Sequence, residues 1–430
     1  MRVLHLSTAD AGGGAARAAH RLHTGLRSLG VDSSMLVLRR TSGDPTSHKV
    51  TFSTDLLTRL RRSYRNRQIR RDFARYKPTL PAGFEWFSDD RTEVGYDLVR
   101  DVVKRGPWDV INLHWVGGLV DHELFFPHLP PAVPLVWRLA DMGALTGGCH
   151  YDGGCGKFTA TCGACPVLGS TVDDDLSRQV WRRKRAALAA IPDDRMTLVG
   201  TSRWIAAESR RSSLLKRFPV RVIPNGLDTE AFAPRDKASA RATLGVPADA
   251  AVVLFVAEAT DVRRKGFAYL VDALGRLGGV PNLFLLSVGE RLPVLPEELR
   301  LPRLHLGRVT DDHRLSVAYS AADVFVIPSL QESFGQTVTE SMACGTPVVG
   351  FDAGGIPDMV RPGVTGELAP VGDANALADR IAEVLLNPVR WRQNAGTCRR
   401  VAVDEYGLRL QAERYLELYQ ASVNAPAAAR

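Results

Sequence analysis

Short apolar runs alternate with helix-like runs from one end of the chain to the other, and this alternation constrains the fold most. The runs with strand character are Val3–Leu6, Ser34–Leu38, Val110–Leu113, Leu135–Leu139, Leu198–Thr201, Val252–Val256, Leu283–Val288, Val324–Ile327 and Pro347–Phe351. Strands separated by helices form parallel sheets that are covered on both faces. Because 430 residues exceed one ordinary core, we predict an α/β protein with two doubly wound, Rossmann-like domains.

A turn near the middle of the chain marks the expected domain junction. Residues 221–228 contain Pro-Asn-Gly, which is typical of a turn. We expect one domain over residues 1–222 and a second over residues 223–405. An amphipathic helix is expected over residues 406–424, and we expect the remaining tail, residues 425–430, to be disordered.

The composition is that of a soluble globular protein. No run of about 18 apolar residues occurs, as a membrane-spanning helix would require. The N-terminal residues 1–7 enter a strand pattern directly, without an apolar signal core. We therefore expect a cytoplasmic location. The formal net charge of +8 suits an acidic ligand or an anionic membrane surface.

Much of the positive charge lies in residues 57–77, where arginines are interleaved with aliphatic and aromatic residues. The spacing allows a basic amphipathic helix. The segment is either a solvated helix face or mobile loop, or a peripheral contact with a membrane or an acidic acceptor. No nucleic-acid recognition motif accompanies the charge, so we expect no nucleic-acid partner.

Two strand-to-helix turns carry residues suited to a phosphate-bearing ligand. Gly12, Gly13 and Gly14 follow the first strand and open a helix, so a ligand can approach the backbone there, or the glycines only make a tight turn. Their spacing is not that of a dinucleotide motif. Arg263-Arg264-Lys265 follows the strand Val252–Val256, where its cations can neutralise a diphosphate.

The segment Glu332-Ser-Phe-Gly-Gln-Thr-Val-Thr-Glu340 has the most specific pattern in the chain. Its residues are typical of a loop that turns into a short helix before a buried strand. Backbone amides at a helix start attract phosphate or sugar oxygens. A carboxylate inside that helix can hold paired hydroxyls, as an acidic residue does on ribose. Arg308 and Val309 end another strand on the same predicted sheet edge and can border a nucleotide base.

Together these segments resemble the retaining nucleotide-sugar glycosyltransferases of family 4, over nearly the whole chain. The motifs that carry the resemblance are Gly12–Gly14, Ile223–Asp228, Arg264–Gly266, Gly307–Val309, Ala322–Ser329, Glu332–Val349 and Ala353–Asp358. The resemblance implies the GT-B fold, in which a cleft lies between the two domains. It implies an acceptor-binding N-terminal domain, a donor-binding C-terminal domain and a C-terminal helix that crosses back onto the first.

The resemblance also implies the donor and the roles of individual residues. Glu332, Lys265 and Arg264 would be catalytic, with the cations on the diphosphate and Glu332 on the sugar. The nucleoside diphosphate sugar would be held by Gly13, Gly14, Arg263, Arg308, Val309, Phe334, Gly335, Gln336, Thr337 and Glu340, with Glu340 on the ribose. No divalent cation or other cofactor is implied for catalysis. The acceptor would be a hydroxyl of a lipid-linked saccharide or of a small molecule.

The chain departs from the family pattern after the strand Leu135–Leu139. Family members usually carry His-Asp there, whereas this chain has Ala140-Asp141. His114 ends a neighbouring strand and either compensates for the missing His or has a structural or acceptor-side role. We expect His114 and Asp141 on the acceptor side. Two alternatives to sugar transfer stay open. One is a nucleotide-sugar epimerase on the same fold, and the other, which Ala140 motivates, is a non-catalytic sugar-nucleotide-binding partner subunit. The intact pair Glu332 and Glu340 favours transfer.

A cysteine-rich loop is the last distinctive feature. Cys149, Cys155, Cys162 and Cys165 lie close together in a Gly-rich stretch that ends in C-x2-C. Four such thiols suit a structural zinc site, and disulfides or free thiols are the alternatives. A similar Thr-Gly-Gly-Cys-His-Tyr loop occurs in a subset of family 4 sequences, which implies an insertion near the acceptor site.

Overall fold

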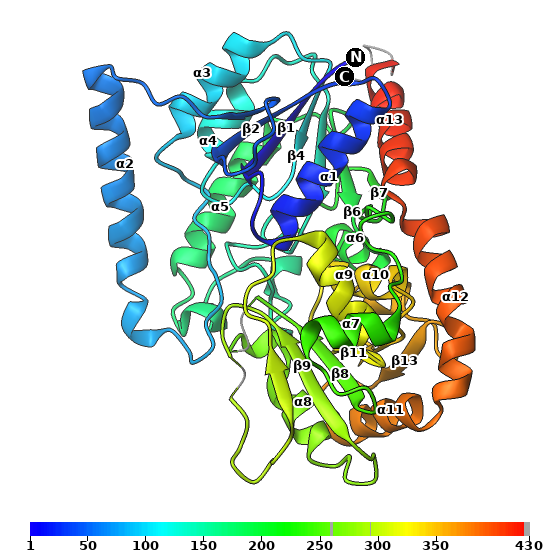
Figure 1. Ribbon diagram of the computed structural model, residues 1–430. Coiled ribbons are helices and arrows are strands. Elements are labelled where there is room, and N and C mark those ends of the chain that lie inside the picture. The colour runs from blue at the N-terminus through cyan, green and yellow to red at the C-terminus, as the bar shows by residue number, and fades with distance from the viewer. Residues whose placement is uncertain (259–260, 293, 425–430) are drawn as a thin grey trace. The chain divides into compact units, whose positions relative to one another are not determined.

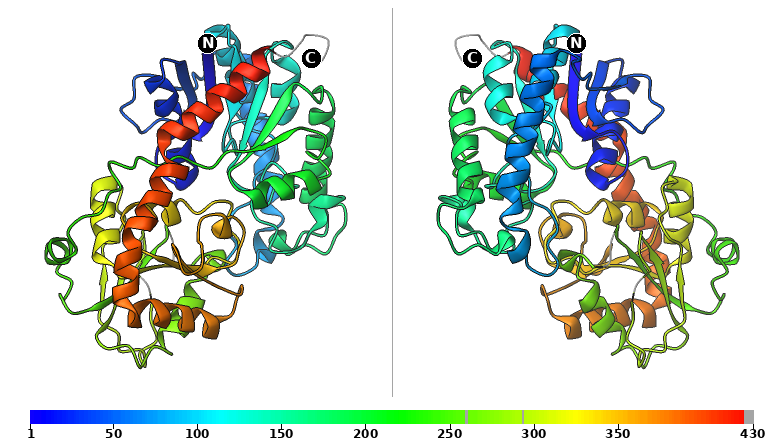
Figure 2. Two further views of the ribbon diagram at one scale, coloured as in Figure 1. Left: turned by 90° about the vertical axis from the view of Figure 1, so that its right-hand side faces the viewer. Right: turned by 90° about the vertical axis from the view of Figure 1, so that its left-hand side faces the viewer.

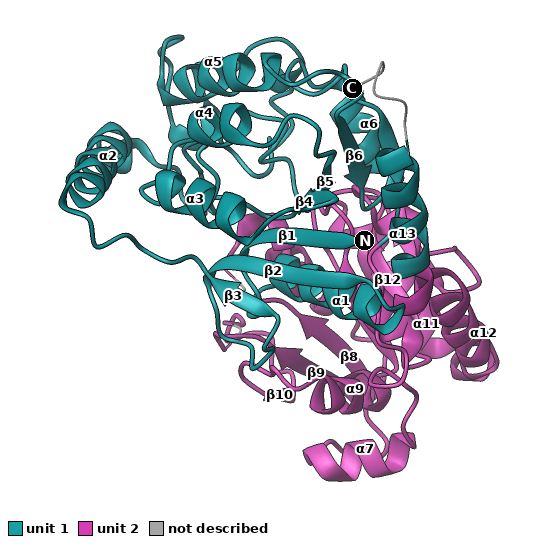
Figure 3. Cartoon of the chain, turned by 90° about the horizontal axis from the view of Figure 1, so that it is seen from above, with its two compact units in different colours: residues 1–224, 411–430 teal, residues 225–410 magenta. Residues whose placement is uncertain are grey.

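The chain forms two compact units in a computed structural model, which describes residues 1–258, 261–292 and 294–424 (Figure 1). Unit 1 contains residues 1–224 and the C-terminal segment from Gln411, and unit 2 contains residues 225–410 (Figure 3). The predicted tail 425–430 lies outside the described residues. No helix in the described part of the chain is both long and apolar enough to cross a membrane.

Unit 1 is built on a seven-stranded parallel sheet in the order β3-β2-β1-β4-β5-β6-β7. Its strands are β1 (Arg2–Ala9), β2 (Asp32–Arg39), β3 (Ser47–Lys49), β4 (Val110–Leu113), β5 (Leu135–Leu139), β6 (Met196–Gly200) and β7 (Val220–Val222). Successive side chains of β1 enter different cores, because Val3 packs with Tyr415 of the C-terminal helix whereas Leu4 packs with Leu98 on the other face. The sheet is therefore covered on both faces, as the sequence predicts.

Helices α5 and α6 of unit 1 begin at residues whose side chains satisfy free backbone N–H groups. Asp175 accepts from Arg178 N at the start of α5, and Ser202 accepts from Ile205 N at the start of α6. The helices and 3₁₀ turns of this unit are α1 (Gly14–Ser28), α2 (Leu56–Ala74), η1 (Lys77–Thr79), α3 (Gly95–Arg105), α4 (His122–Phe125), η2 (Phe126–His128), η3 (Lys157–Thr159), η4 (Pro166–Leu168), α5 (Leu176–Ala189), α6 (Arg203–Arg211) and α13 (Leu408–Asn424).

Helix α2 differs from the other long helices of unit 1 because none of its residues is buried. It covers most of the basic segment 57–77. Figure 2 shows it along the side of unit 1, next to the helices of that unit but outside its core.

Unit 2 is built on a six-stranded parallel sheet in the order β10-β9-β8-β11-β12-β13. Residues 252–255 of its strand β8 are all buried, as expected for a strand between two helix layers. The elements are α7 (Lys237–Leu244), β8 (Ala251–Val256), η5 (Arg263–Lys265), α8 (Phe267–Leu274), β9 (Leu283–Val288), β10 (Arg303–His305), α9 (Asp312–Ala321), β11 (Val324–Ile327), α10 (Gln336–Ala343), β12 (Val348–Phe351), η6 (Ile356–Asp358), β13 (Gly366–Ala369), α11 (Ala374–Leu386) and α12 (Pro388–Tyr406).

Candidate functional site

Two neighbouring strands of unit 2 end where the predicted catalytic residues meet. The strand order reverses at β8, which has β9 on one side and β11 on the other. In open α/β sheets, ligands bind beyond the carboxyl ends of the strands at such a reversal. The turn η5 follows β8 and Glu332 follows β11. The topology of unit 2 therefore brings Arg264, Lys265 and Glu332 to the position where this fold binds ligands.

An ion pair joins these residues. The Lys265 Nζ atom donates to Glu332 Oε2 over 2.6 Å, and Arg264 Nη1 lies 3.7 Å from the same oxygen. Burial opposes ionisation of Glu332, but Lys265 and Arg264 outweigh it and hold the pKa of this carboxyl below its ordinary value. The Lys265 side chain remains 29% exposed. The pair is thus ionised and accessible, so a ligand phosphate can compete for the cations while Glu332 accepts from a sugar hydroxyl.

Two glycines allow the strand ends to come this close. Gly266 has φ +71°, and a Cβ there would lie 1.7 Å from the Pro328 carbonyl oxygen. A Cβ on Gly354 would lie 2.0 Å from the Glu332 carbonyl oxygen, to which Gly355 N donates over 2.8 Å. Side chains at either position would displace the turn that carries Lys265 or the backbone of Glu332.

Helix α10 begins directly behind Glu332. Its N-cap, Gly335, has φ +90°, and Gln336 and Thr337 form the half-buried first turn. Glu340 is buried one turn further on, where the Tyr319 hydroxyl donates to its Oε2 over 3.2 Å. Phe334 lies in the hydrophobic core of unit 2. Of the predicted donor residues in this segment, Phe334 therefore offers a ligand its backbone rather than its ring.

The other predicted donor residues lie at three further places. Arg263 is exposed on η5. Arg308 is exposed beyond β10 and donates to Glu290 Oε1 over 2.9 Å, with half-buried Val309 beside it. Gly13 and Gly14 belong to unit 1, where Gly13 caps α1 and its carbonyl accepts from Ala16 N and Arg17 N.

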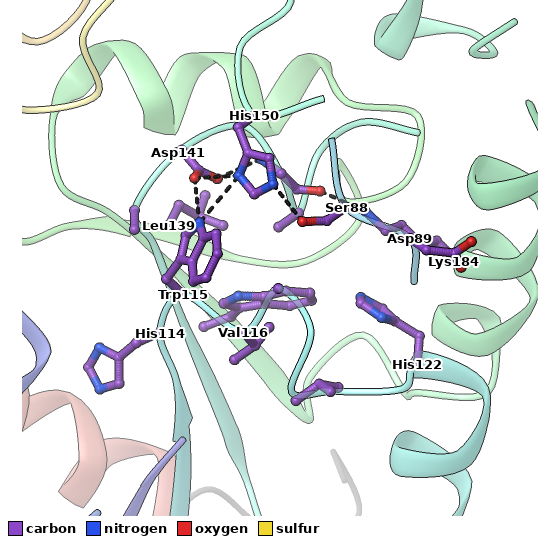
Figure 4. Close-up of a pocket in the computed structure, with 16 residues that line it drawn as sticks. Ser88, Asp89, His114, Trp115, Val116, His122, Leu139, Asp141, His150 and Lys184 are labelled. Carbon is purple, nitrogen blue, oxygen red and sulfur yellow. Dashed lines mark hydrogen bonds and ion pairs between the residues drawn. The ribbon is translucent and has the colours of Figure 1, made fainter. Parts of the chain in front are cut away.

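Unit 1 contains a pocket beyond the ends of β4 and β5 (Figure 4). Both residues predicted on the acceptor side, His114 and Asp141, line it. His114 is bonded inside the protein, because its Nε2 lies 2.8 Å from His5 Nδ1 and Arg138 Nη1 donates to its Nδ1 over 3.3 Å. Burial and the charge of Arg138 lower the pKa of His114 well below its ordinary value, so its imidazole is neutral.

Asp141 has different partners, two of which the sequence did not indicate. Its Oδ2 accepts from Trp115 Nε1 over 2.8 Å and lies 2.6 Å from His150 Nδ1. The second ring nitrogen of His150 lies 2.8 Å from Ser88 Oγ. Figure 4 shows these four side chains gathered on one wall, with the His114 ring apart from them. Trp115 is the second residue after β4, and His150 is the His of the Thr-Gly-Gly-Cys-His-Tyr motif, but neither position indicated a contact with Asp141.

The four loop cysteines line a second, smaller cavity in unit 1. All four are free thiols, and burial raises the pKa of Cys162 to about 11. Within the described residues, no three His, Cys, Asp or Glu side chains converge closely enough to hold a metal ion. The structural zinc site therefore stays a prediction. Cys344 and Cys398 are buried in unit 2.

The segment that carries the ion pair also matches a known family. Residues 236–398 match the model described as Glycosyl transferases group 1. This segment of unit 2 is therefore similar to the group 1 glycosyl transferases. Lys265, Glu332 and Glu340 all lie within it.

Curated relatives match the chain over about half its length. It is 33% identical over 235 residues to the alpha-maltose-1-phosphate synthase of Mycolicibacterium smegmatis, a match that covers 49% of this chain and 60% of the relative. It is 32% identical over 275 residues to the D-inositol 3-phosphate glycosyltransferase of Saccharomonospora viridis, which covers 56% and 63%. The chain thus spans less than two thirds of either relative.

Solved structures match the chain over nearly its whole length. Sucrose-phosphate synthase from Thermosynechococcus elongatus has a TM-score of 0.68 at 22% identity, over 99% of this chain and 100% of that one. WaaG, a glycosyltransferase involved in lipopolysaccharide biosynthesis, has a TM-score of 0.63 at 16% identity, over 99% and 100%. These matches, with the two parallel sheets, show that the predicted GT-B fold is correct.

Proposed function

We propose that the chain is a retaining glycosyltransferase that moves a sugar from a nucleoside diphosphate sugar to an acceptor hydroxyl. The observation that carries the proposal is the accessible ion pair of Lys265 with Glu332 at the strand-order reversal of unit 2. A diphosphate binding there meets two cations, and the sugar beyond it meets the Glu332 carboxylate. The group 1 match over the same residues supports this assignment.

In this proposal the C1–O bond to the leaving diphosphate breaks, and a C1–O bond to the acceptor forms on the same face of the sugar. The acceptor proton passes to an oxygen of the leaving diphosphate. Lys265 and Arg264 stabilise the negative charge that develops there, which is the role that preorganised charges play in transfer reactions. No divalent cation is part of this scheme. The α10 amides bind the donor, and Glu340 binds the ribose hydroxyls.

We place the acceptor on unit 1 and the donor on unit 2. The acceptor belongs to polysaccharide, glycolipid or glycosylated-metabolite synthesis. The curated relatives are named for maltose 1-phosphate and for D-inositol 3-phosphate, so phosphorylated sugars and inositols belong in the acceptor panel.

The test measures nucleoside diphosphate release from a panel of nucleotide sugars with and without acceptors. We expect release with at least one donor, and loss of about 10²–10³-fold in the variant Glu332→Gln. The matched control is Glu298→Gln, because Glu298 is an exposed glutamate of the same unit. Donor binding without release would favour the non-catalytic partner subunit that Ala140 suggests. Conversion of the donor to an epimer without acceptor would favour an epimerase.

We further propose that helix α2 contacts an anionic membrane surface. Its inner face is held by ion pairs, since Arg62 pairs with Asp97 and Arg65 with Asp121. Its outer face exposes Leu56, Leu57, Leu60 and Tyr64, which helical spacing puts on one side. Exposed Arg59, Arg61, Arg67 and Arg71 lie along the same helix. Apolar residues flanked by cations are typical of helices that lie in a membrane interface.

Vesicle flotation tests this contact. The protein should float with vesicles containing anionic lipid at low salt and should be released at high salt. Exchange of Leu57 and Leu60 for serine should abolish flotation. The same exchange at Val103, an exposed residue of α3, serves as control. Absence of flotation at low salt would contradict the proposal.

We also propose that the cysteine-rich loop binds structural zinc. The supporting observation is that four free thiols line one cavity. Purified protein should contain about one zinc per chain by elemental analysis, and a chelator should expose four reactive thiols. Cys149→Ser should lower the zinc content, whereas Cys398→Ser in unit 2 should not. Metal-free protein with an intact, thiol-reactive loop would contradict the proposal.

A further inference from the structure

The pocket of unit 1 contains a polar cluster that the sugar-transfer scheme does not use. Asp141 accepts from Trp115 Nε1 over 2.8 Å, from Gly143 N over 2.7 Å, and pairs with His150 Nδ1 at 2.6 Å. Burial opposes ionisation of Asp141, but His150 and these N–H groups hold the pKa of the carboxyl below its ordinary value. The pocket thus presents an ionised carboxylate.

The network also fixes one hydrogen position on His150. Since Asp141 only accepts, His150 Nδ1 carries a proton, and its Nε2 lies 2.8 Å from Ser88 Oγ. A ligand hydroxyl could take the place of Ser88 as the partner of Nε2, and another could donate to Asp141.

Aromatic rings form a continuous rim beside this cluster. The centroid of Trp115 lies 5.4 Å from that of His150 and 6.2 Å from that of Trp86. Trp86 is 52% exposed, and its Nε1 donates to Ser88 Oγ over 3.1 Å. An exposed indole held by its polar end offers its apolar face to a ligand.

Contacts from the cysteine-rich loop hold the rim in place. Phe87 forms an antiparallel bridge with Cys149, and Ser88 N donates to Gly148 O over 2.8 Å. Buried Lys184 of α5 also donates to Gly143 O over 2.7 Å and to Thr146 O over 3.1 Å. The segment with Trp86 and the loop with His150 are therefore fastened to each other, and the site is preorganised.

We propose that this pocket binds a pyranose ring, so that the acceptor of the proposed transfer is a saccharide. One face of a pyranose carries C–H groups that stack on an indole, and its hydroxyls suit a carboxylate and an imidazole. An anionic phosphate fits poorly, because Asp141 repels it and the nearby Lys184 is bonded to two carbonyls. A lipid chain would place apolar groups against an ionised carboxylate. The inference rests on the proposed function.

Saturation-transfer NMR on the full chain tests it, with methyl α-pyranosides of glucose, mannose and galactose and with maltose as probes. We expect transfer to the ring C–H protons of at least one probe. The variants Trp86→Ala and Asp141→Asn should each weaken binding about tenfold. The control Tyr96→Ala removes another exposed aromatic ring of unit 1 and should leave binding unchanged.

Three outcomes would overturn the inference: no probe binds, binding is equal in wild type and Trp86→Ala, or inositol 1-phosphate binds in preference to every pyranoside. Nucleoside diphosphate release is measured in the same samples. If release persists while no saccharide binds, this inference fails and the proposed function stands. If saccharide binds but no donor is turned over, the proposed function fails instead.

Discussion

At the scale of single residues, the proposed donor site depends on one carboxylate that pairs with two cations. Glu332 carries a negative charge in a largely buried position, and Lys265 lies closer to it than Arg264 does. Removing one partner of such a pair costs more than the pair contributes, because the remaining charge stays desolvated. Loss of Lys265 is therefore expected to weaken the proposed donor site and also to destabilise unit 2 around Glu332.

We predict that Lys265→Ala lowers nucleoside diphosphate release about 10²–10³-fold, because the leaving group loses its nearest cation. The matched control is Arg276→Ala, which removes an exposed cation of the same unit. Steady-state kinetics with the preferred donor measure the effect. Equal rates in the Lys265 variant and the control would remove Lys265 from the proposed diphosphate site.

The sequence indicated those site residues that lie next to a glycine-rich turn or at the end of a strand. It did not indicate the site residues that contact each other through irregular loops. Lys265 and Glu332 lie far apart in the chain, yet each follows a strand, so the parallel topology predicts their meeting. His150 reaches Asp141 through an irregular loop with several left-handed glycines. No periodicity describes such a path, so the pairing could not be predicted.

At the scale of elements, the sequence did not predict four strands: β3, β7, β10 and β13. These are the four edge strands of the two sheets. An edge strand has a neighbour on one side only, so it is short and needs fewer apolar residues. Arg221 and Arg303, for example, stand in β7 and β10. The central strands are buried on both faces and were recognisable from their apolar runs.

Buried histidines connect β1, α1 and β4 in unit 1. His5 bonds to His114, and His23 bonds to Ser33 Oγ and Thr46 Oγ1. Burial lowers the pKa of His23 to about 4. The folded state therefore binds fewer protons than the unfolded state below pH 6.5, and stability falls as the pH drops from 6.5 toward 4.

We predict that the variant His23→Gln loses part of this pH dependence. Between pH 7 and pH 5, the unfolding free energy of wild type should fall by about 2 kcal/mol more than that of the variant. Urea titrations at both pH values measure the difference. Burial raises the pKa of Asp90 to about 6, so its effect on stability over this pH range is opposite to that of the histidines. Because Asp90 is present in both proteins, its contribution cancels in the comparison. A constant difference between the two proteins would contradict a neutral, buried His23.

At the scale of the whole molecule, the two units differ in how much of each is covered by the match to a known family. The family match covers 236–398, almost entirely within unit 2, where the ligand is a nucleotide sugar in the proposed scheme. Unit 1 carries the exposed helix α2, the cysteine-rich loop and the aromatic pocket, which the match does not include. The reaction class is therefore indicated by unit 2, and we propose that the choice of acceptor is made by unit 1.

In the proposed reaction, the sugar is transferred with retention from a nucleotide sugar bound at Lys265 and Glu332. The most direct measurement is time-resolved ¹H NMR of donor turnover by the full chain, with water as acceptor. Starting from an α-linked donor, we predict that the α-anomer of the free sugar forms first and that Glu332→Gln abolishes its formation. Initial formation of the β-anomer, or no nucleoside diphosphate release from any donor, would contradict the account.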